Sequence, residues 1–306
     1  MNLAIVIPYF KIDFFAATLN SLSEQSNKNF EVYIGNDGSP SNPEEIISQY
    51  SNSLPIRYFD FKINLGASSL VSHWQRCIEK VNDAEWILLL GDDDVLEPNC
   101  ISDFYNNINT INEKNINVVR FGTKIINNRG ESISKVHVHE KVENSVNFIM
   151  NKILGPARSS LSEHIFRKKF LKFKHFPLAW YSDDLALLEV SNFGDIYSIN
   201  SSVVSIRASS LNISSNKGLS RIKNIATFEF YHYLINKYYT QFNAAQKLIL
   251  FDKYEKSVLN DKKNYLLFLK LSKTYIQKNK FNVYFRFFKL YLSNILNAYR
   301  SQSREV

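Results

Sequence analysis

The chain has 306 residues, of which 45% are hydrophobic, and a formal net charge of +8 at pH 7. A chain of this size and composition can bury a large core, so a disordered or fibrous protein is excluded. Two cysteines, Cys77 and Cys100, are too few for a disulfide framework, and no stretch reaches the roughly 20 apolar residues of a membrane-spanning helix. We therefore expect a cytoplasmic protein without a signal peptide, either free or attached to the inner face of the membrane.

Strand-like runs alternate with amphipathic helical stretches from residue 3 to residue 125. The expected strands are 3–10, 30–37, 56–61, 86–90 and 117–125, and the expected helices lie near 14–25, 43–50, 69–81 and 98–113. This alternation favours an α/β fold with a mostly parallel sheet. Ligands of such sheets bind at the carboxyl ends of the strands, so the polar residues that close these runs, Asn64 among them, are candidates for the site.

The chain changes character twice after this part. Residues 127–139 alternate between polar and apolar side chains, which predicts an antiparallel excursion. Beyond about residue 214, Gly and Pro nearly vanish and long helical periodicity follows, so we place a boundary between residues 210 and 220. From Gln246 to the end there are 13 Lys and Arg against 4 Asp and Glu, so the excess positive charge lies in this helical extension.

The sharpest signal is the acidic run Asp92, Asp93 and Asp94, directly after the apolar run WILLL. Adjacent carboxylates at a strand end repel one another and attract a cation. Residues two apart in an extended segment point to the same side, so Asp92 and Asp94 can share one hard divalent ion. The alternative is a solvated acidic turn, which the buried strand before it disfavours.

A second polar cluster, YIGNDGS, closes the strand at residues 30–37. Asp37 can accept a hydrogen bond from a nucleobase N–H, and Gly38 lets the backbone turn close to a ligand. The alternative is a ligand-free Asn-Asp-Gly turn.

A third cluster, WYSDDLALL at residues 180–188, opens with a carboxylate pair. One of Asp183 and Asp184 can act as a general base beside an aromatic wall of Trp180 and Tyr181. The alternative is helix capping, because acids in a first turn stabilise a helix.

Weaker candidates are two arginines and two histidines. Arg76 and Arg207 can clamp a diphosphate or form surface ion pairs. His137 and His139 share one face of a strand, but two histidines without a third ligand are more often solvated than metal-bound. Dinucleotide-binding, P-loop, zinc-protease and nucleophile-elbow motifs are absent from the sequence.

These clusters, in this order, resemble family 2 glycosyltransferases of the GT-A fold. The resemblance spans about residues 3–207 and rests on AIVIPYF, IGNDGS, INLGAS, LGDDDVL and SDDLALL. It implies a GT-A catalytic domain over residues 1–215, in which about 1–96 bind the nucleotide sugar and about 125–207 the acceptor. Residues 216–306 are then a basic, aromatic-rich helical unit.

The resemblance also implies roles for individual residues. Pro8, Tyr9 and Asp37 would contact the nucleobase, Asp92 would lie by the ribose, and Asp94 would bind Mn²⁺ or Mg²⁺ bridging the diphosphate. The full set expected around the nucleotide sugar is Pro8, Tyr9, Asp37, Asn64, Arg76, Asp92, Asp93 and Arg207, with Asp94 and Asp92 as metal ligands.

The implied reaction is an inverting single displacement in which Asp184 deprotonates the acceptor hydroxyl. Many members carry Glu-Asp where this chain has Asp183 and Asp184, so either carboxylate can be the base. Many members also carry a histidine where this chain has Ser209, which leaves ion ligation to aspartate, the diphosphate and water.

The resemblance favours an enzyme of bacterial surface polysaccharide synthesis, such as O-antigen, that uses a UDP-sugar and a glycan acceptor linked to undecaprenyl diphosphate. Residues 281–299 repeat apolar side chains at helical spacing, and a basic amphipathic helix of this kind can lie on an anionic membrane. The alternative is that its apolar face packs on the catalytic domain. No nucleic acid partner is expected, because no recognised binding module accompanies the charge.

Two other functions remain open at the level of sequence. One is a nucleotide-sugar-binding or scaffold protein of the same fold that has no turnover. The other is a nucleotidyltransferase, although PYFKIDFF fits poorly to the glycine-rich loop that such enzymes place after the first strand.

Overall fold

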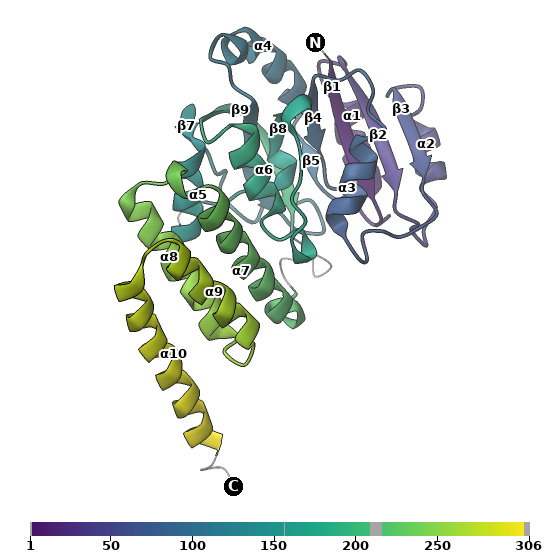
Figure 1. The fold of residues 1–306 in the computed structure, drawn as a ribbon. Coiled ribbons are helices and arrows are strands. Elements are labelled where there is room, and N and C mark those ends of the chain that lie inside the picture. The colour runs from purple at the N-terminus through teal and green to yellow at the C-terminus, as the bar shows by residue number, and fades with distance from the viewer. Residues whose placement is uncertain (1, 156, 209–215, 303–306) are drawn as a thin grey trace. The chain divides into compact units, whose positions relative to one another are not determined.

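The computed structural model describes residues 2–155, 157–208 and 216–302, with side chains as far as Leu296 (Figure 1). The described residues form two compact units. One consists of Met1–His175 and Ser182–Ser215, and the other of Phe176–Tyr181 and Asn216–Val306.

The first unit contains a mixed sheet with the strand order β3-β2-β1-β4-β8-β6-β9-β5, and β7 pairs with β9. The strands are β1 Leu3–Tyr9, β2 Phe30–Asn36, β3 Ile56–Asp60, β4 Trp86–Leu89, β5 Val95–Leu96, β6 Val118–Ile126, β7 Val142–Asn144, β8 His164–Arg167 and β9 Asp195–Arg207. Strands β1 to β4 pair in parallel, as do β6 and β9, whereas β5, β7 and β8 run antiparallel to their neighbours. Parallel strands are joined by crossover connections, which are usually helices. The strand–helix alternation in the sequence, which predicts such parallel pairing, ends at β6.

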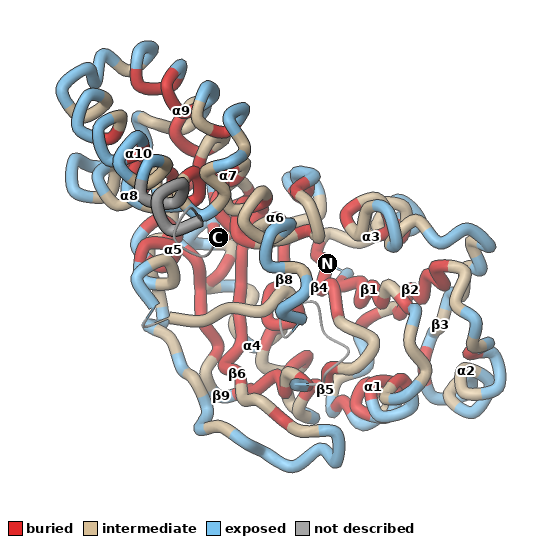
Figure 2. The backbone as a smooth tube through the Cα atoms, turned by 90° about the horizontal axis from the view of Figure 1, so that it is seen from below, coloured by how far each residue is buried: buried red, intermediate tan, exposed pale blue. Residues whose placement is uncertain are grey.

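Helices cover both faces of the parallel part of the sheet. They are α1 Phe15–Ser23, α2 Glu44–Tyr50, α3 Leu70–Ile78, α4 Cys100–Glu113, α5 Ser145–Leu154 and α6 Ser182–Val190. Figure 2 shows α1 and α2 on one face of β1 to β3 and α3 on the other. The central strand β1 is therefore buried on both sides, which is why LAIVIPY is an almost unbroken apolar run. The expected helices in this part differ from the observed ones by a few residues at their ends.

The parallel pairing sets the position of the polar clusters. Strand β1 lies between β2 and β4, and Tyr9 at its carboxyl end pairs with Asn36 of β2. The turns that follow β2 and β4 therefore flank the end of β1. Asp37 stands on one side of it and the acidic run 92–94 on the other. The antiparallel excursion is present as isolated bridges that pair Thr123 with His137 and Ile126 with Ser132.

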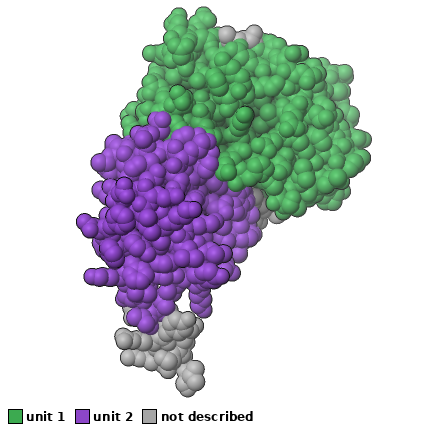
Figure 3. All heavy atoms as spheres, in the orientation of Figure 1, with its two compact units in different colours: residues 1–175, 182–215 green, residues 176–181, 216–306 purple. Residues whose placement is uncertain are grey.

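The second unit is helical and is coloured purple in Figure 3. Its helices are α7 Ser220–Lys237, α8 Ala244–Asn260, α9 Tyr265–Gln277 and α10 Phe281–Gln302. Aromatic rings fill its core, and Tyr181 stacks on Phe230 with centroids 4.5 Å apart. Trp180 and Tyr181, the expected wall of an acceptor site, thus belong to this unit. Among the described helices, none combines the length and the apolar content of a membrane span.

Candidate functional site

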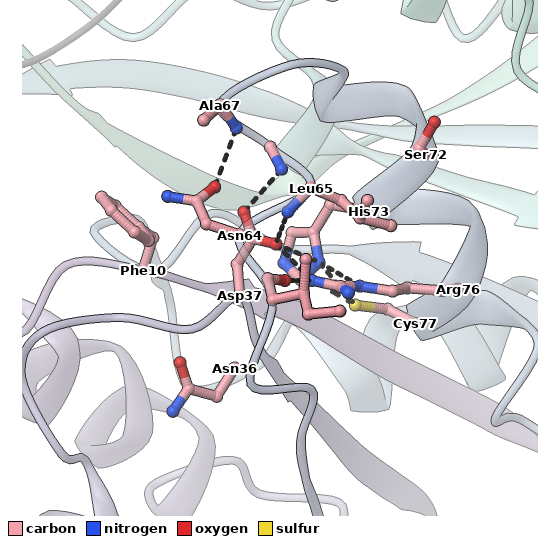
Figure 4. Close-up of polar contacts among 12 residues, drawn as sticks. Phe10, Asn36, Asp37, Asn64, Leu65, Ala67, Ser72, His73, Arg76 and Cys77 are labelled. Atoms are coloured by element: carbon pink, nitrogen blue, oxygen red, sulfur yellow. Dashed lines mark hydrogen bonds and ion pairs between the residues drawn. The ribbon is translucent and has the colours of Figure 1, made fainter.

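Asp37, at the end of β2, is held by three donors (Figure 4). Its carboxylate accepts backbone N–H groups from Leu65 and Gly66, each at 2.8 Å, and pairs with the Arg76 guanidinium from α3. The side chain is 4% exposed. Burial raises the pKa of the Asp37 carboxyl, and the two backbone N–H groups and Arg76 oppose that rise.

Arg76 and Asn64 organise the loop that covers this carboxylate. Arg76 also donates to the Ile63 carbonyl at 2.9 Å, and its guanidinium lies over the Phe61 ring. Asn64 is exposed, and its side-chain oxygen accepts the Ala67 N–H at 2.8 Å. Arg76, expected at the diphosphate, therefore lies beside Asp37, at the place expected for the nucleobase.

Two neighbours of Asp37 constrain its pocket. The imidazole of His73 lies 3.4 Å from the carboxylate, but burial and Arg76 lower the pKa of this histidine to about 3, so the contact is not an ion pair at neutral pH. Gly66 packs so closely that a Cβ at this position would overlap Oδ2 of Asp37. A side chain at this position therefore requires the carboxylate or the loop to shift.

Pro8 and Tyr9 close the end of β1. Pro8 is half-buried, whereas the Tyr9 side chain is fully buried and its hydroxyl donates to the Ser41 carbonyl at 2.9 Å. The backbone of Tyr9 contributes directly, because its carbonyl accepts the Asp37 N–H at 3.0 Å. The Tyr9 ring packs on Phe15 in the core and supports the turn from beneath.

Asp92 ties the acidic turn to the end of β1. One of its carboxylate oxygens accepts the backbone N–H groups of Phe10 at 2.8 Å and Lys11 at 2.7 Å. Burial raises the pKa of Asp92 to about 6, although these two N–H groups lower it. The carboxylate thus fixes the segment that follows Tyr9.

Asp94 has other hydrogen-bond partners than Asp92. Its two oxygens accept the Ser162 hydroxyl at 2.5 Å and the Arg207 backbone N–H at 2.9 Å. Burial and then the neighbouring Asp93 raise the pKa of Asp94 to about 7. Both of these hydrogen-bond donors are neutral groups.

The acidic turn fits a divalent cation of the Mn²⁺ or Mg²⁺ type. Its donors are carboxylate oxygens, which such hard ions prefer, and burial, followed by the charge of Asp93, raises the pKa of Asp94. In the described part of the chain, no three Asp, Glu, His or Cys side chains are grouped as a complete ligand set. Asp94 and Asp92 would therefore hold the ion together with ligands that arrive with a substrate.

Arg207 is built into this turn. Its guanidinium donates to the carbonyls of Asp93 at 2.9 Å and Asn127 at 2.7 Å and lies over the Phe14 ring. The side chain, expected at the diphosphate, thus braces the backbone of the acidic run. Ser209 lies outside the described residues.

The carboxylate pair begins α6. Asp184 accepts Lys152 Nζ of α5 at 2.6 Å, and its side chain is 4% exposed. Asp183 is half-buried, and burial and then Asp184 raise its pKa to about 6, while Lys152 opposes the rise. The residues before the pair are unusual, because Leu178, Ala179 and Tyr181 all have positive φ. The carboxylate pair thus has a charged partner of its own.

A comparison with models of known protein families assigns the chain to a family. The model of the family described as Glycosyl transferase family 2 matches residues 4–172, which is more than half of the chain. The chain belongs to glycosyltransferase family 2. The matched range covers Asp37 and the acidic run 92–94 but ends before the carboxylate pair.

Individual relatives are distant from this family 2 protein. An uncharacterized glycosyltransferase of Rickettsia conorii is 28% identical over 131 residues, covering 42% of this chain and 21% of the relative. One of Rickettsia typhi is 24% identical over 189 residues, covering 58% of this chain and 57% of the relative. The chain therefore matches well under two thirds of the length of these curated relatives.

Solved structures share the fold of this family 2 protein. A fragment of S. aureus TarS in complex with UDP-GlcNAc superposes with a TM-score of 0.64 at 14% identity, covering 90% of this chain and 79% of that one. A longer TarS structure gives 0.61 at 17% identity and covers 84% of this chain and 44% of that one. The GT-A α/β fold class is thereby confirmed, with a mixed sheet and C-terminal helices.

The sequence analysis missed Gly66, Lys152 and Ser162. Each contacts a candidate carboxylate that lies 29 to 68 residues away along the chain. Ser162 also accepts the Gly91 N–H at 3.0 Å, so its hydroxyl bridges both ends of the acidic turn. The glycine of INLGAS was part of a recognised motif, but nothing local marked Lys152 or Ser162 in this family 2 protein.

A second buried polar cluster lies behind Ser162. Arg120 pairs with Glu143 at 2.5 Å, while Nε2 of His139 and of His164 each lie 3.7 Å from Glu163 Oε1. Burial raises the pKa of Glu163 to about 8 and lowers that of His139 to about 3. The expectation that His139 is solvated is wrong, because its side chain is 3% exposed. The lowered pKa keeps its imidazole neutral, and a neutral ring can be buried without a countercharge.

Proposed function

We propose that this family 2 protein is an inverting, metal-dependent glycosyltransferase, and that residues 1–215 move a sugar from a UDP-sugar to a hydroxyl of a glycan acceptor. One observation carries the proposal: the first unit holds three buried carboxylate sites with three different electrostatic environments, at Asp37, at residues 92–94 and at residues 183–184. The TarS structures obtained with UDP-GlcNAc and with UDP support UDP as the carrier.

The Asp37 pocket suits a nucleobase. A carboxylate beside a guanidinium offers an acceptor and donors to one planar group, and uracil presents an imide N–H between two carbonyl oxygens. Oδ1 of Asp37 already accepts bonds from Leu65 and Arg76, whereas Oδ2 accepts one from Gly66 and can accept a second. Asn64, in the loop beside this carboxylate, is exposed.

The transfer itself requires a base and a stabilised leaving group. One carboxylate of the pair takes the proton of the acceptor hydroxyl while that oxygen forms a bond to the anomeric carbon. The bond from this carbon to the β-phosphate oxygen breaks, and UDP leaves with the electron pair. Asp94 and Asp92 would hold a divalent cation, which would supply Lewis-acid stabilisation of the negative charge that develops on the leaving group. A positioned base contributes roughly 10²- to 10⁴-fold.

Thermal-shift measurements and a transfer assay test the proposal together. We expect UDP-sugars to stabilise the wild-type protein in the presence of Mn²⁺, and Asp94→Ala to abolish the part of the shift that needs the ion. Transfer with release of UDP supports a glycosyltransferase. Release of pyrophosphate instead would indicate a nucleotidyltransferase. Nucleotide binding that Asp184→Asn leaves unchanged, together with no transfer by the wild-type protein to any acceptor, would indicate a scaffold.

We further propose that the acceptor is a glycan linked to undecaprenyl diphosphate, as in bacterial surface polysaccharide synthesis, and that α9 and α10 rest on the inner face of the cytoplasmic membrane. Residues 265–302 carry seven Lys and Arg and no Asp or Glu. Helix α10 buries Phe287 and Tyr291, yet it exposes a second apolar stripe: Phe281 49%, Phe285 60%, Leu292 42% and Leu296 57%. Tyr299, at the end of the expected stripe, lies beyond the described side chains.

Exposed apolar rings among lysines suit an anionic bilayer, because the rings enter the interface while the ammonium groups meet headgroups. A self-associated dimer would bring two positive faces together, which disfavours it. We expect the full chain to float with anionic vesicles and not with neutral ones. Phe285→Ser with Leu292→Ser should reduce binding at least tenfold, since each buried side chain contributes about 1.5–3 kcal/mol. Ile133→Ser, at an exposed position of the other unit, is the matched control. Equal flotation of both variants would remove the membrane proposal.

A further inference from the structure

Lys152 is the cation of the carboxylate pair. It lies in the last turn of α5, and its ammonium group donates to Asp184 Oδ1 at 2.6 Å. The helix ends at Gly155, whose φ of 106° only glycine adopts readily and whose N–H caps the carbonyls of Asn151 and Lys152. The backbone at Lys152 is thus anchored, and the ammonium group reaches the pair from a fixed point.

The contact between Lys152 and Asp184 affects the ionisation of the carboxylate pair. Two adjacent carboxylates in a buried first turn repel each other, and neutralising them by protonation would remove the base. Burial and Asp184 already raise the pKa of Asp183 to about 6, and Lys152 is the group that opposes this rise. Burial lowers the pKa of Lys152 itself, but Asp184 and Asp183 more than reverse that effect, so its ammonium form persists.

The charged groups around the pair come from three elements. Lys152 faces it from α5, Asp183 and Asp184 stand next to each other on α6, and Glu163 of the turn Leu161–Glu163 also raises the pKa of Lys152. Burial raises the pKa of Glu163 to about 8, which favours its neutral form at pH 7. The hydrogen bond of the Lys152 ammonium group goes to Asp184.

We propose that Lys152 is a positioning residue that keeps the Asp183–Asp184 pair ionised and holds Asp184 in one orientation, so that the pair can accept the proton of the acceptor hydroxyl near neutral pH. This inference rests on the proposed function. It does not depend on which of the two aspartates takes the proton, because the ammonium group stabilises the ionised form of the pair as a whole.

The test is the pH dependence of kcat/KM for wild type, Lys152→Met and Lys152→Arg between pH 5 and pH 9. Without the ammonium group, the carboxylates hold their protons to higher pH, so the acid limb of the Lys152→Met profile should move up by about one pH unit or more. Activity at pH 7 should fall about tenfold and largely recover at pH 9. Lys152→Arg should restore most of the wild-type profile, because it keeps the charge.

Three further measurements separate this role from a structural one. Stabilisation by UDP and Mn²⁺ should be unchanged in Lys152→Met, and Lys135→Met, at an exposed lysine of the same unit, should behave as wild type. If Lys152→Met does not fold, Lys152→Gln takes its place. NMR titration of ¹³C-labelled aspartate carboxyls should show the same upward shift, whether or not an acceptor is known.

The outcomes are distinct for the two proposals. A wild-type protein that transfers sugar, with Lys152→Met showing an unmoved acid limb or a uniform loss at every pH, overturns the role of Lys152. A wild-type protein that transfers no sugar refutes the proposed function. In that case the carboxyl titration still decides whether Lys152 controls the ionisation of the pair.

Discussion

Two runs of adjacent aspartates in the same unit are stabilised in opposite ways. At the end of β4, Asp94 is bound by a hydroxyl and a backbone N–H, and burial raises its pKa to about 7. At the start of α6, Asp184 is bound by the ammonium group of Lys152 at 2.6 Å. The donors to Asp94 are neutral groups, whereas the partner of Asp184 is a cation of the protein itself.

The difference suits the two roles proposed above for these runs. A metal site must remain able to accept a positive charge, and a lysine at bonding distance would compete with the ion. A general base must stay ionised without a ligand, so a fixed countercharge suits it. The same residue type thus serves two roles, and the partners that distinguish them come from distant parts of the chain.

Asp94→Asn tests the run without a built-in cation and should have the largest effect. Loss of the ion at the diphosphate removes several kcal/mol of transition-state stabilisation, so kcat/KM should fall by at least about 100-fold. The same change removes a buried charge, so the metal-free protein should melt a few degrees higher at pH 8. A transfer assay and a thermal melt measure the two effects. Asp195→Asn, at an exposed aspartate, is the control, and unchanged activity of Asp94→Asn would contradict the metal role.

Asp184→Asn makes the same change in the run at the start of α6. It should lower the stability of the protein, whereas Asp94→Asn should raise it. It leaves Lys152, whose side chain is only 24% exposed, without its carboxylate. Breaking such a pair should lower the free energy of unfolding by about 2–3 kcal/mol at pH 7. Urea unfolding measures the change. Stabilisation of both aspartate variants would show that the two runs do not differ as described.

Gly66→Ala extends the comparison to Asp37, the carboxylate that has both backbone donors and a guanidinium. The added Cβ would overlap Oδ2 of Asp37, so the loop or the carboxylate must move. We expect about 1–2 kcal/mol lower stability, in line with other overpacked sites, and roughly tenfold weaker UDP binding. Calorimetric titration with UDP measures the affinity. Gly122→Ala, where an added Cβ would meet its nearest atom at 3.4 Å and the backbone is not left-handed, controls for loss of glycine as such.

Glu163→Gln concerns a third kind of buried carboxyl. Its raised pKa favours the neutral form at pH 7, so it needs no metal ion and no lysine as a countercharge. The pKa of Glu163 is raised from 4.5 to about 8, so the folded state binds more protons than the unfolded state between these pH values. The stability that the protonated Glu163 contributes at low pH is therefore lost as the pH rises through 8. Glutamine does not titrate. The free energy of unfolding of Glu163→Gln relative to wild type should therefore rise between pH 5 and pH 8, by at most about 1.4 kcal/mol per pH unit. Chemical unfolding at several pH values measures it, and a constant difference would contradict the buried neutral carboxyl.

The local pattern of the chain predicted the α/β fold, most strands and helices of the N-terminal half, and the position of Asp37 and Asp92 to Asp94 at strand ends. These features depend on side-chain periodicity and on turn residues within a few positions of one another, so they can be recognised without tertiary contacts. The mixed part of the sheet was harder to predict. Strand β8 has four residues, and its neighbours β4 and β6 are set by long-range pairing.

By itself, the sequence determined which residue types stand at the ends of β2 and β4, and that a basic helical segment follows. Only the tertiary structure decided what each carboxylate contacts: Arg76 and Gly66 at Asp37, Ser162 at Asp94, and Lys152 at Asp184. The tertiary structure also decided which apolar residues of α10 are buried. Partners that lie tens of residues apart meet only when the chain packs, and the charge and burial that fix the chemistry of an aspartate arise from that packing.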